Sequence, residues 1–332
     1  MNGGKQTIIF ENPPVIRAHY GMAGPKEGKG PLSGDFDEIL KDDTLGEKSY
    51  EKAECKMHLH TIEKAIEMAG LEESDIDLML SGDLLNQIIT SSFSARELDI
   101  PFIGLYNACS TFGSALAIGA ILTSSGYVEH VCCSTSSHFS TAERQYRYPL
   151  ELGTQMTPSA QWTVTGCGCT VLSRKGEGIK ITGATFGKVV DYDIKDANNM
   201  GAAMAPAAAY TLLAHLKDTN REPSYYDLIY TGDLGILGCE LFDCLLESEG
   251  INLKEIHEDC GRMIFAPEQK VKMGGSGAGC SSLVFNTHII KRIKKGELKK
   301  ILLLPTGALL SKVSSLQGES IPGIAHAVSI EV

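Results

Sequence analysis

Residues 107–113 read Asn-Ala-Cys-Ser-Thr-Phe-Gly and open a run of small and apolar residues that continues to Thr123. An apolar stretch precedes this run, and Ser125-Gly126 and a strand-like stretch follow it. The order predicts a strand, a helix that begins near Cys109 and a second strand. The first turn of a helix presents unpaired N–H groups and a positive dipole end, so a thiolate or a bound carboxylate would be stabilised at Cys109. The alternative is that Cys109 is a small core residue.

The same order returns in the second half of the chain. Residues 77–84, Asp-Leu-Met-Leu-Ser-Gly-Asp-Leu, correspond to residues 227–234, Asp-Leu-Ile-Tyr-Thr-Gly-Asp-Leu. Residues 274–280 then open a second small-residue helix, as the first motif does. Alternation of strands and helices predicts parallel pairing with helices on the faces of the sheet. We therefore expect an α/β protein with two similar halves, residues 1–175 and 176–332.

Composition narrows the class of protein. The 332 residues are 43% hydrophobic and 21% charged, as in globular proteins, and the net charge of −11 argues against nucleic acid as a partner. The apolar run 301–304 is far too short to cross a bilayer, and the first seven residues form no signal segment. The ten cysteines have no disulfide-scaffold spacing and no second pair at zinc-ligand spacing. We expect an intracellular protein without a metal or cofactor.

Two aspartates follow the repeated strands. If a pseudo-twofold axis relates the halves, Asp83 and Asp233 both lie at the carboxyl ends of strands, where α/β sheets carry their sites. Their carboxylates could accept hydrogen bonds from a ligand or bind Ca²⁺. Each could instead cap the turn that follows it. We favour capping for Asp233 and leave both interpretations open for Asp83.

Further polar and aromatic side chains could contact a ligand. Ser136 and His138 follow the end of a predicted strand and could pair with a carboxylate, although a lone loop histidine is usually solvated. Arg144 and Arg147 could together hold a carboxylate, or face solvent or another subunit. Trp162, the single tryptophan, could stack on a flat ring or belong to the core.

Three segments resemble the thiolase superfamily, especially its condensing enzymes of the ketoacyl synthase III type. Residues 107–113 resemble their nucleophile elbow, and residues 165–172 resemble the Gly-rich strands that close the first half. Residues 274–279 lie where those enzymes carry a Gly-Asn-Ser/Thr or Gly-His motif. The resemblance implies a thiolase-like fold with duplicated β/α halves in a five-layered α-β-α-β-α sandwich.

A further set of segments spans both halves of the chain: residues 9–14, 28–32, 106–111, 159–163, 230–235 and 272–277. In these segments the chain is more similar to the stage V sporulation protein AD family of spore-forming Firmicutes. The resemblance implies binding of dipicolinic acid (pyridine-2,6-dicarboxylate), or its calcium chelate, for uptake into the developing spore. It also implies membrane proteins of the same operon as partners, and thiolase-like folds commonly form homodimers.

The residues favour a binding protein over an enzyme. A condensing enzyme needs two further groups beside its cysteine, commonly His/His or His/Asn. Residues 274–279 contain neither His nor Asn, and Asp233 stands where the superfamily often supplies a His. A carboxylate there would repel a developing oxyanion, so we expect a non-catalytic pocket. Its predicted ligand-binding residues are Asp83, Cys109, Ser136, His138, Arg144, Gly275 and Ser276.

Two alternatives stay open. One is an active acyltransferase that uses Cys109 as its nucleophile. The other is a scaffold that recruits membrane proteins and binds no ligand in this pocket.

Overall fold

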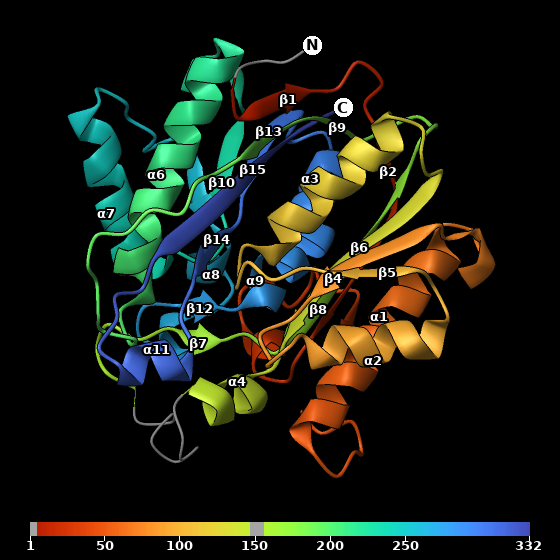
Figure 1. Ribbon diagram of the computed structural model, residues 1–332, viewed down its shortest axis with the longest axis horizontal. Helices are drawn as coiled ribbons and strands as arrows, with labels where there is room; N and C mark the ends of the chain where they lie inside the picture. The colour runs from red at the N-terminus through yellow and green to blue at the C-terminus, as the bar shows by residue number, and fades with distance from the viewer. Residues whose placement is uncertain (1–4, 147–155) are drawn as a thin grey trace.

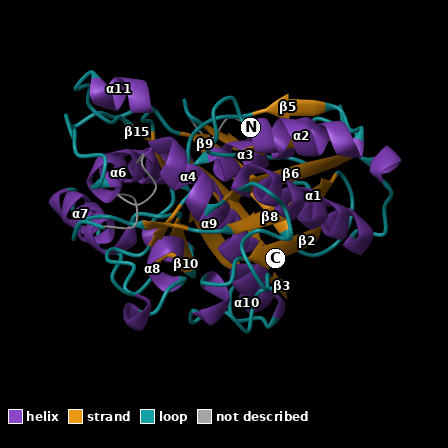
Figure 2. Ribbon diagram, turned by 90° about the horizontal axis from the view of Figure 1, so that it is seen from below, coloured by secondary structure: helices purple, strands orange, loops and turns teal. Residues whose placement is uncertain are grey.

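Residues 5–146 and 156–332 are described by a computed structural model of the chain (Figures 1 and 2). The helices are α1 (Tyr50–Met68), α2 (Ile89–Leu98), α3 (Thr111–Ser124), α4 (Phe139–Tyr146), α6 (Met200–Thr219), α7 (Gly235–Ser248), α8 (Cys260–Met263), α9 (Ala278–Val284), α10 (Ile290–Lys294) and α11 (Lys312–Leu316). The strands are β1 (Thr7–Ile9), β2 (Val15–Ala23), β3 (Glu38–Ile39), β4 (Leu78–Gly82), β5 (Phe102–Gly104), β6 (His130–Ser137), β7 (Trp162–Thr163), β8 (Gly166–Ser173), β9 (Lys180–Phe186), β10 (Leu228–Thr231), β11 (His257–Asp259), β12 (Gly275–Ser276), β13 (Lys300–Leu304), β14 (Thr306–Ala308) and β15 (Gly323–Glu331).

The strand order shows the duplication directly. One half runs β5-β4-β6-β8-β2 and the other runs β11-β10-β13-β15-β9. In each half the first three strands are parallel, and the next two pair antiparallel. The halves meet where β2 pairs with β9 at Val15 and Lys180. The predicted alternation of strands and helices is therefore confirmed, with antiparallel pairs added toward the centre.

Five layers stack across the molecule. Figure 1 shows α6 and α7 on one side, α1 and α2 on the other, and α3 and α9 between them. α3 packs on β4 and β6 of the first half and on β9 and β15 of the second. Phe112 and Leu116 of α3 are completely buried, and each such side chain contributes about 2 kcal/mol through burial. The arrangement is the predicted α-β-α-β-α sandwich.

Two expectations differ from the structure in detail. The sequence after residue 280 predicts a single helix over residues 281–295, but the structure divides it into α9, a π-helical turn at Phe285–Ile289 and α10. In that turn the side-chain amide of Asn286 donates to the carbonyl of Ser282. The Gly, Pro and charged residues of 22–51 predict a long excursion over the surface, but Glu27 and Phe36 of this segment are buried. This segment is therefore partly core.

Among the described residues, no helix combines the length and the apolar character that a membrane span requires.

Candidate functional site

Cys109 lies just before the first residue of α3 and is only 6% exposed. Ala108 before it has φ of +48°, a left-handed conformation that costs a residue with a Cβ about 1–2 kcal/mol. Neighbouring hydroxyl groups hold this turn. Thr111 Oγ1 donates to the Ala108 carbonyl at 2.6 Å, and Ser110 Oγ donates to the Pro305 carbonyl at 2.7 Å. The predicted position of Cys109 at a helix N-terminus is thus confirmed.

A small cavity of about 60 Å³ adjoins Cys109. This volume accommodates about four water molecules. Both halves of the chain contribute to its walls, which are mostly apolar. The described lining includes Glu143 but no Lys, Arg or His. The lining residues are Leu84, Tyr106, Ala108, Cys109, Ala142, Glu143, Tyr146, Thr163, Ala197, Met200, Ser276, Gly277, Ala308 and Leu310.

Asp233 organises the second-half side of this site. Its Oδ2 accepts hydrogen bonds from Ser276 Oγ at 2.7 Å and from the Gly277 N–H at 3.1 Å. Its Oδ1 accepts a hydrogen bond from Thr306 Oγ1 at 2.7 Å. Cys109 Sγ lies 3.8 Å from Ser276 Oγ. Because the Ser276 hydroxyl proton points to Asp233, the Cys109 thiol is the donor in its contact with Ser276.

The electrostatics of this group disfavour a thiolate. Burial raises the pKa of Cys109 well above its ordinary value, and the negative charge of Asp233 raises it further. Burial also raises the pKa of Asp233 to about 6, although Ser276 and Thr306 donate hydrogen bonds to it. Only the thiolate is an effective nucleophile. The arrangement therefore keeps Cys109 as a neutral hydrogen-bonding group.

The two strand-end aspartates have different partners, and only Asp83 stabilises its own turn. Asp83 Oδ1 accepts from the Leu85 N–H at 2.9 Å, and Oδ2 accepts from the N–H and hydroxyl of Ser91, each at 2.8 Å. Asp83 thus fixes the turn that leads into α2 and is not among the described lining residues of the cavity. Capping was favoured for Asp233, and this expectation was wrong. Asp259 stabilises the corresponding turn by accepting from the Leu234 and Gly235 N–H groups at 2.9 and 3.0 Å.

Ser136 and His138 are buried but point elsewhere. Ser136 Oγ donates to Glu54 Oε1 at 3.0 Å. His138 Nε2 lies 2.7 Å from the Asp43 carbonyl, and its Nδ1 accepts from the Ser140 N–H at 3.2 Å. Neither side chain is part of the described lining of the cavity. We had expected both in its wall, but their polar atoms bind other segments of the chain.

Of the remaining predicted ligand-binding residues, one lines the cavity and the others lie outside its described lining. Ser276 lines the cavity, whereas Gly275 precedes it in β12 and is not in the described lining. Arg144 forms an ion pair with Glu51 on the outside of α4, and Arg147 lies outside the described residues. Trp162 stacks on Phe139, with ring centroids 3.8 Å apart. Contact of any of these residues with a ligand stays a prediction.

Several residues of the site carry no local signal in the sequence. The sequence predicts an irregular stretch over residues 144–158, and Glu143 and Tyr146 of α4 lie beside and within it. Thr306 follows the last parallel strand. Glu54 lies on α1 and is 1% exposed, but nothing in the pattern of α1 distinguishes it from the exposed glutamates of that helix.

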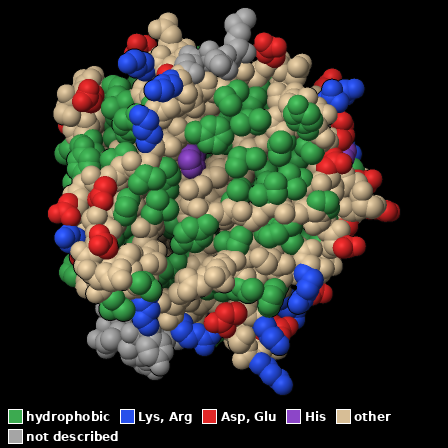
Figure 3. Space-filling model, viewed as in Figure 1, with side chains coloured by type: hydrophobic (Ala, Val, Ile, Leu, Met, Phe, Trp, Pro, Cys, Tyr) green, Lys and Arg blue, Asp and Glu red, His purple; other side chains and the backbone are tan. Residues whose placement is uncertain are grey.

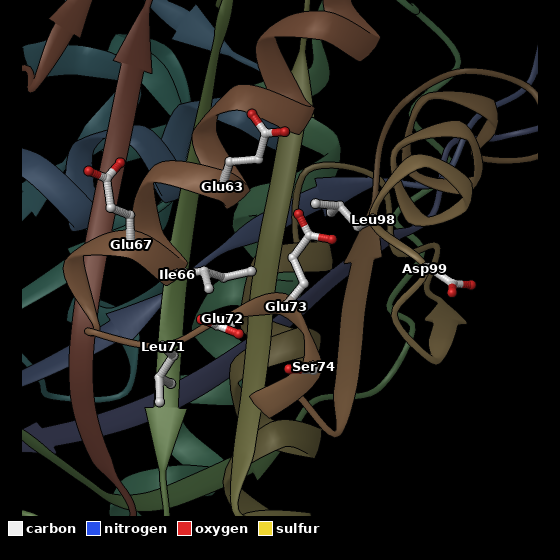
Figure 4. A pocket seen from close by; sticks show the side chains of 9 residues that line it. All are labelled: Glu63, Ile66, Glu67, Leu71, Glu72, Glu73, Ser74, Leu98 and Asp99. Atoms are coloured by element: carbon white, nitrogen blue, oxygen red, sulfur yellow. The ribbon is translucent and has the colours of Figure 1, made fainter.

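A wider hollow of about 680 Å³ lies away from Cys109 (Figure 4). Its labelled carboxylates come from α1, from the turn after it and from the end of α2. The corresponding region of the second half carries Lys217, Arg221 and Lys254 beside its acids. Within the described part of the chain, no group of three or more His, Cys, Asp or Glu is arranged to hold a metal ion. The Cys109 cavity therefore remains the candidate site.

Comparisons with known proteins agree with this fold. The family model for Stage V sporulation protein AD (SpoVAD) matches residues 4–331. Stage V sporulation protein AD of Bacillus subtilis (strain 168) is 44% identical over 328 residues, which cover 99% of this chain and 97% of that protein.

Solved structures of condensing enzymes share the fold at low sequence identity. 3-Oxoacyl-[acyl-carrier-protein] synthase III from Aquifex aeolicus VF5 is 13% identical, with a TM-score of 0.57, and the match covers 96% of this chain and 100% of that one. Cerulenin-bound OleA of Xanthomonas campestris is 14% identical, with a TM-score of 0.63, and the match covers 98% of each chain. At such identities the likeness establishes a thiolase-like fold alone.

Proposed function

The chain belongs to the stage V sporulation protein AD family, and from this premise we propose that it binds dipicolinic acid without catalysis for uptake into the developing spore. In this proposal it acts with membrane proteins of the same sporulation operon. The observation that carries the proposal is the state of Cys109. The residue stands at the position of a condensing nucleophile, yet burial and Asp233 hold the pKa of its thiol well above the ordinary value. A pocket built in this way favours binding over reaction.

The charge of the cavity favours the calcium chelate over the free dianion. The described lining includes Glu143 and no cationic side chain, and Asp233 lies directly behind Ser276. Among these described residues a dianion would meet no cationic side chain, so its desolvation cost would be high. The chelate of Ca²⁺ with the dicarboxylate is neutral, and its Ca²⁺ can accept further oxygen ligands.

Calorimetric titration tests the proposal. We expect saturable binding of dipicolinate in the presence of Ca²⁺, and weaker binding of isophthalate, which lacks the ring nitrogen. Cys109→Ala should weaken binding several-fold because it removes a wall atom and its hydrogen bond. Cys280→Ala is the matched control, since Cys280 is a buried cysteine at the start of α9 outside the described lining.

Absence of binding at millimolar dipicolinate, with and without Ca²⁺, would refute the proposal. The alternative, an acyltransferase with Cys109 as nucleophile, predicts a covalent adduct on the Cys109 peptide after incubation with acyl-CoA. Mass spectrometry of digested protein separates the two functions.

We propose further that two copies associate through β5. This strand forms one end of the sheet, where backbone groups of an edge strand are open to pairing. Apolar side chains gather over the face that contains α2, α3 and β5, with charged groups around it (Figure 3). Exposed members of this region are Ile89, Phe93, Ile103 and Tyr106. Ile103→Lys should convert a dimer to a monomer in light scattering, and a monomeric wild type would exclude the interface.

A further inference from the structure

Glu54 is a buried acid that connects three elements. It lies on α1 and is 1% exposed. Its Oε1 is 3.0 Å from Ser136 Oγ on β6, and its Oε2 is 2.7 Å from Thr141 Oγ1 on α4. The carboxyl group thus joins the end of β6 to α4.

The hydroxyl groups around Glu54 can accommodate its protonated form. Thr141 Oγ1 is also 2.9 Å from the His138 carbonyl, which can only accept a hydrogen bond. A hydroxyl group has one proton to donate. If Thr141 donates it to His138, a protonated Glu54 can donate to Thr141 while accepting from Ser136. All three contacts are then satisfied, whereas the carboxylate form would compete with the His138 carbonyl for the single proton.

The charges that face Glu54 also favour its neutral form. Burial and the negative charge of Asp83 raise the pKa of Glu54 to about 8 and outweigh the hydrogen bonds of Thr141 and Ser136, which lower it. Glu51 of the same helix adds to the increase. Burial raises the pKa values of the nearby thiols of Cys167 on β8 and Cys55 on α1, and the charge of Glu54 adds to this. The guanidinium group of Arg144 on α4 is paired with Glu51 on the outer side.

The other contacts of α4 show why its position matters. Ala142, Glu143 and Tyr146 of this helix line the Cys109 cavity. Tyr146 also donates its hydroxyl to the carbonyl of Leu84 on the opposite wall at 2.7 Å. A dipicolinate molecule is larger than the cavity of about 60 Å³, so a wall must move to admit it. Among the described residues, α4 provides three wall side chains in one rigid element.

We propose that Glu54 is a positioning residue of the cavity, whose protonated carboxyl group holds α4 against α1 and the end of β6. Deprotonation places a second negative charge near Asp83, and the carboxylate then competes with the His138 carbonyl for the single Thr141 proton, so α4 detaches. The effect on ligand binding rests on the proposed function, whereas the movement of α4 does not.

Tryptophan fluorescence of the ligand-free protein tests the movement. Trp162 is the only tryptophan, and it stacks on Phe139, the first residue of α4, at 3.8 Å. We expect a change of emission with a midpoint near pH 8 in the wild type. Glu54→Gln keeps both an acceptor and a donor and should remove this transition. Thr141→Val, which cannot bond to Glu54, should give the detached emission at every pH.

Glu27→Gln is the matched control. Glu27 is also a buried glutamate, with a pKa raised to about 7 by burial, and Lys26 beside it lies over the Trp162 ring. This variant should retain the transition near pH 8. A transition that persists in Glu54→Gln, or one that disappears in Glu27→Gln, would overturn the proposal. Circular dichroism confirms that each variant is folded.

Calorimetry then tests the consequence for binding. If only the protonated form closes the cavity, affinity for dipicolinate with Ca²⁺ falls about tenfold from pH 7 to pH 9, and Glu54→Gln binds equally at both. A fluorescence transition without any dipicolinate binding would support the positioning role and refute the proposed ligand. Binding without pH dependence in the wild type would refute the positioning role and leave the ligand supported.

Discussion

Asp83 and Asp233 end the same repeated motif in the two halves but have different surroundings. Among the described residues, Asp83 accepts hydrogen bonds from Leu85 and Ser91, which lie within eight residues of it. Asp233 accepts hydrogen bonds from Ser276, Gly277 and Thr306, which lie far along the chain. The first aspartate stabilises a turn, and the second joins three segments beside Cys109. Equivalent positions in a duplicated fold have thus taken on local and long-range roles.

The difference depends on a third acid. In the second half, Asp259 on β11 accepts from the N–H groups of Leu234 and Gly235 and from Thr231 Oγ1. Asp259 therefore performs the task that Asp83 performs in the first half. Because Asp259 stabilises the turn that follows β10, the Asp233 carboxylate can bind Ser276 in the wall of the cavity.

Asp83→Ala should have the largest effect. The substitution leaves two buried N–H groups and a buried hydroxyl without their acceptor, so we expect the free energy of unfolding to fall by about 4 kcal/mol. Urea denaturation followed by circular dichroism measures this loss. The comparison breaks down if the loss is below about 1 kcal/mol, because the turn would then be stable without Asp83.

Asp233→Asn should change how stability depends on pH. Burial raises the pKa of Asp233 in the folded protein to about 6, above its value near 4 in the unfolded chain. The native state therefore retains this proton longer, and its stability contribution is lost as the pH rises from about 4 to about 6. Relative to Asp233→Asn, the free energy of unfolding of the wild type should fall by on the order of 2 kcal/mol across this pH window. Above the window the difference between the two proteins should stay constant.

The same variant tests the link to Cys109. Removal of the negative charge lowers the pKa of the thiol, so alkylation of the Cys109 peptide by iodoacetamide should become several-fold faster at pH 8. Cys244, which is exposed, serves as the internal reference in mass spectrometry. Equal Cys109 rates in the two proteins would show that Asp233 does not control the thiol.

Gly277→Ala should destabilise the N-terminus of α9, which Asp233 contacts in the second half. Gly277 has φ of +123°, and a Cβ there would approach Ser137 Oγ to 2.6 Å. We expect a loss of about 2 kcal/mol in unfolding free energy, from backbone strain and the close contact together. Gly178→Ala is the matched control, because Gly178 has φ of +106° with open space around it. Equal losses in the two variants would contradict a role for the contact with Ser137.

Ala108→Gly should have the smallest effect, and it should be stabilising. Ala108 is left-handed with φ of +48°, a conformation that glycine adopts without steric cost. The gain is partly offset by the greater freedom of glycine in the unfolded chain, so we expect about 0.5 kcal/mol. Thermal unfolding by calorimetry measures it. A lower melting temperature would show that the elbow at Cys109 is not strained.

Much of the fold could be predicted from local patterns. The strands that end at Gly82 and Thr231 and the helix that starts after Cys109 lie where their periodicity placed them. The divided helix at Phe285–Ile289 could not be foreseen, because Asn286 also binds Thr170 of a distant strand. Hydrophobic periodicity indicates which face of a helix or strand is apolar. It does not indicate which distant segment a polar side chain will bind.

The amino-acid sequence alone determined the two halves, the layered α/β class, the place of Cys109 at a helix start and the resemblance to the family. Only the tertiary structure decided that Asp233 shares the site with Cys109, while Asp83, Ser136 and His138 bind elsewhere. It also revealed Glu54, which contacts residues 82 and 87 positions away. The physical reason is that a buried polar atom must find a hydrogen-bond partner, and its partner is set by the packing of distant segments rather than by neighbours in sequence.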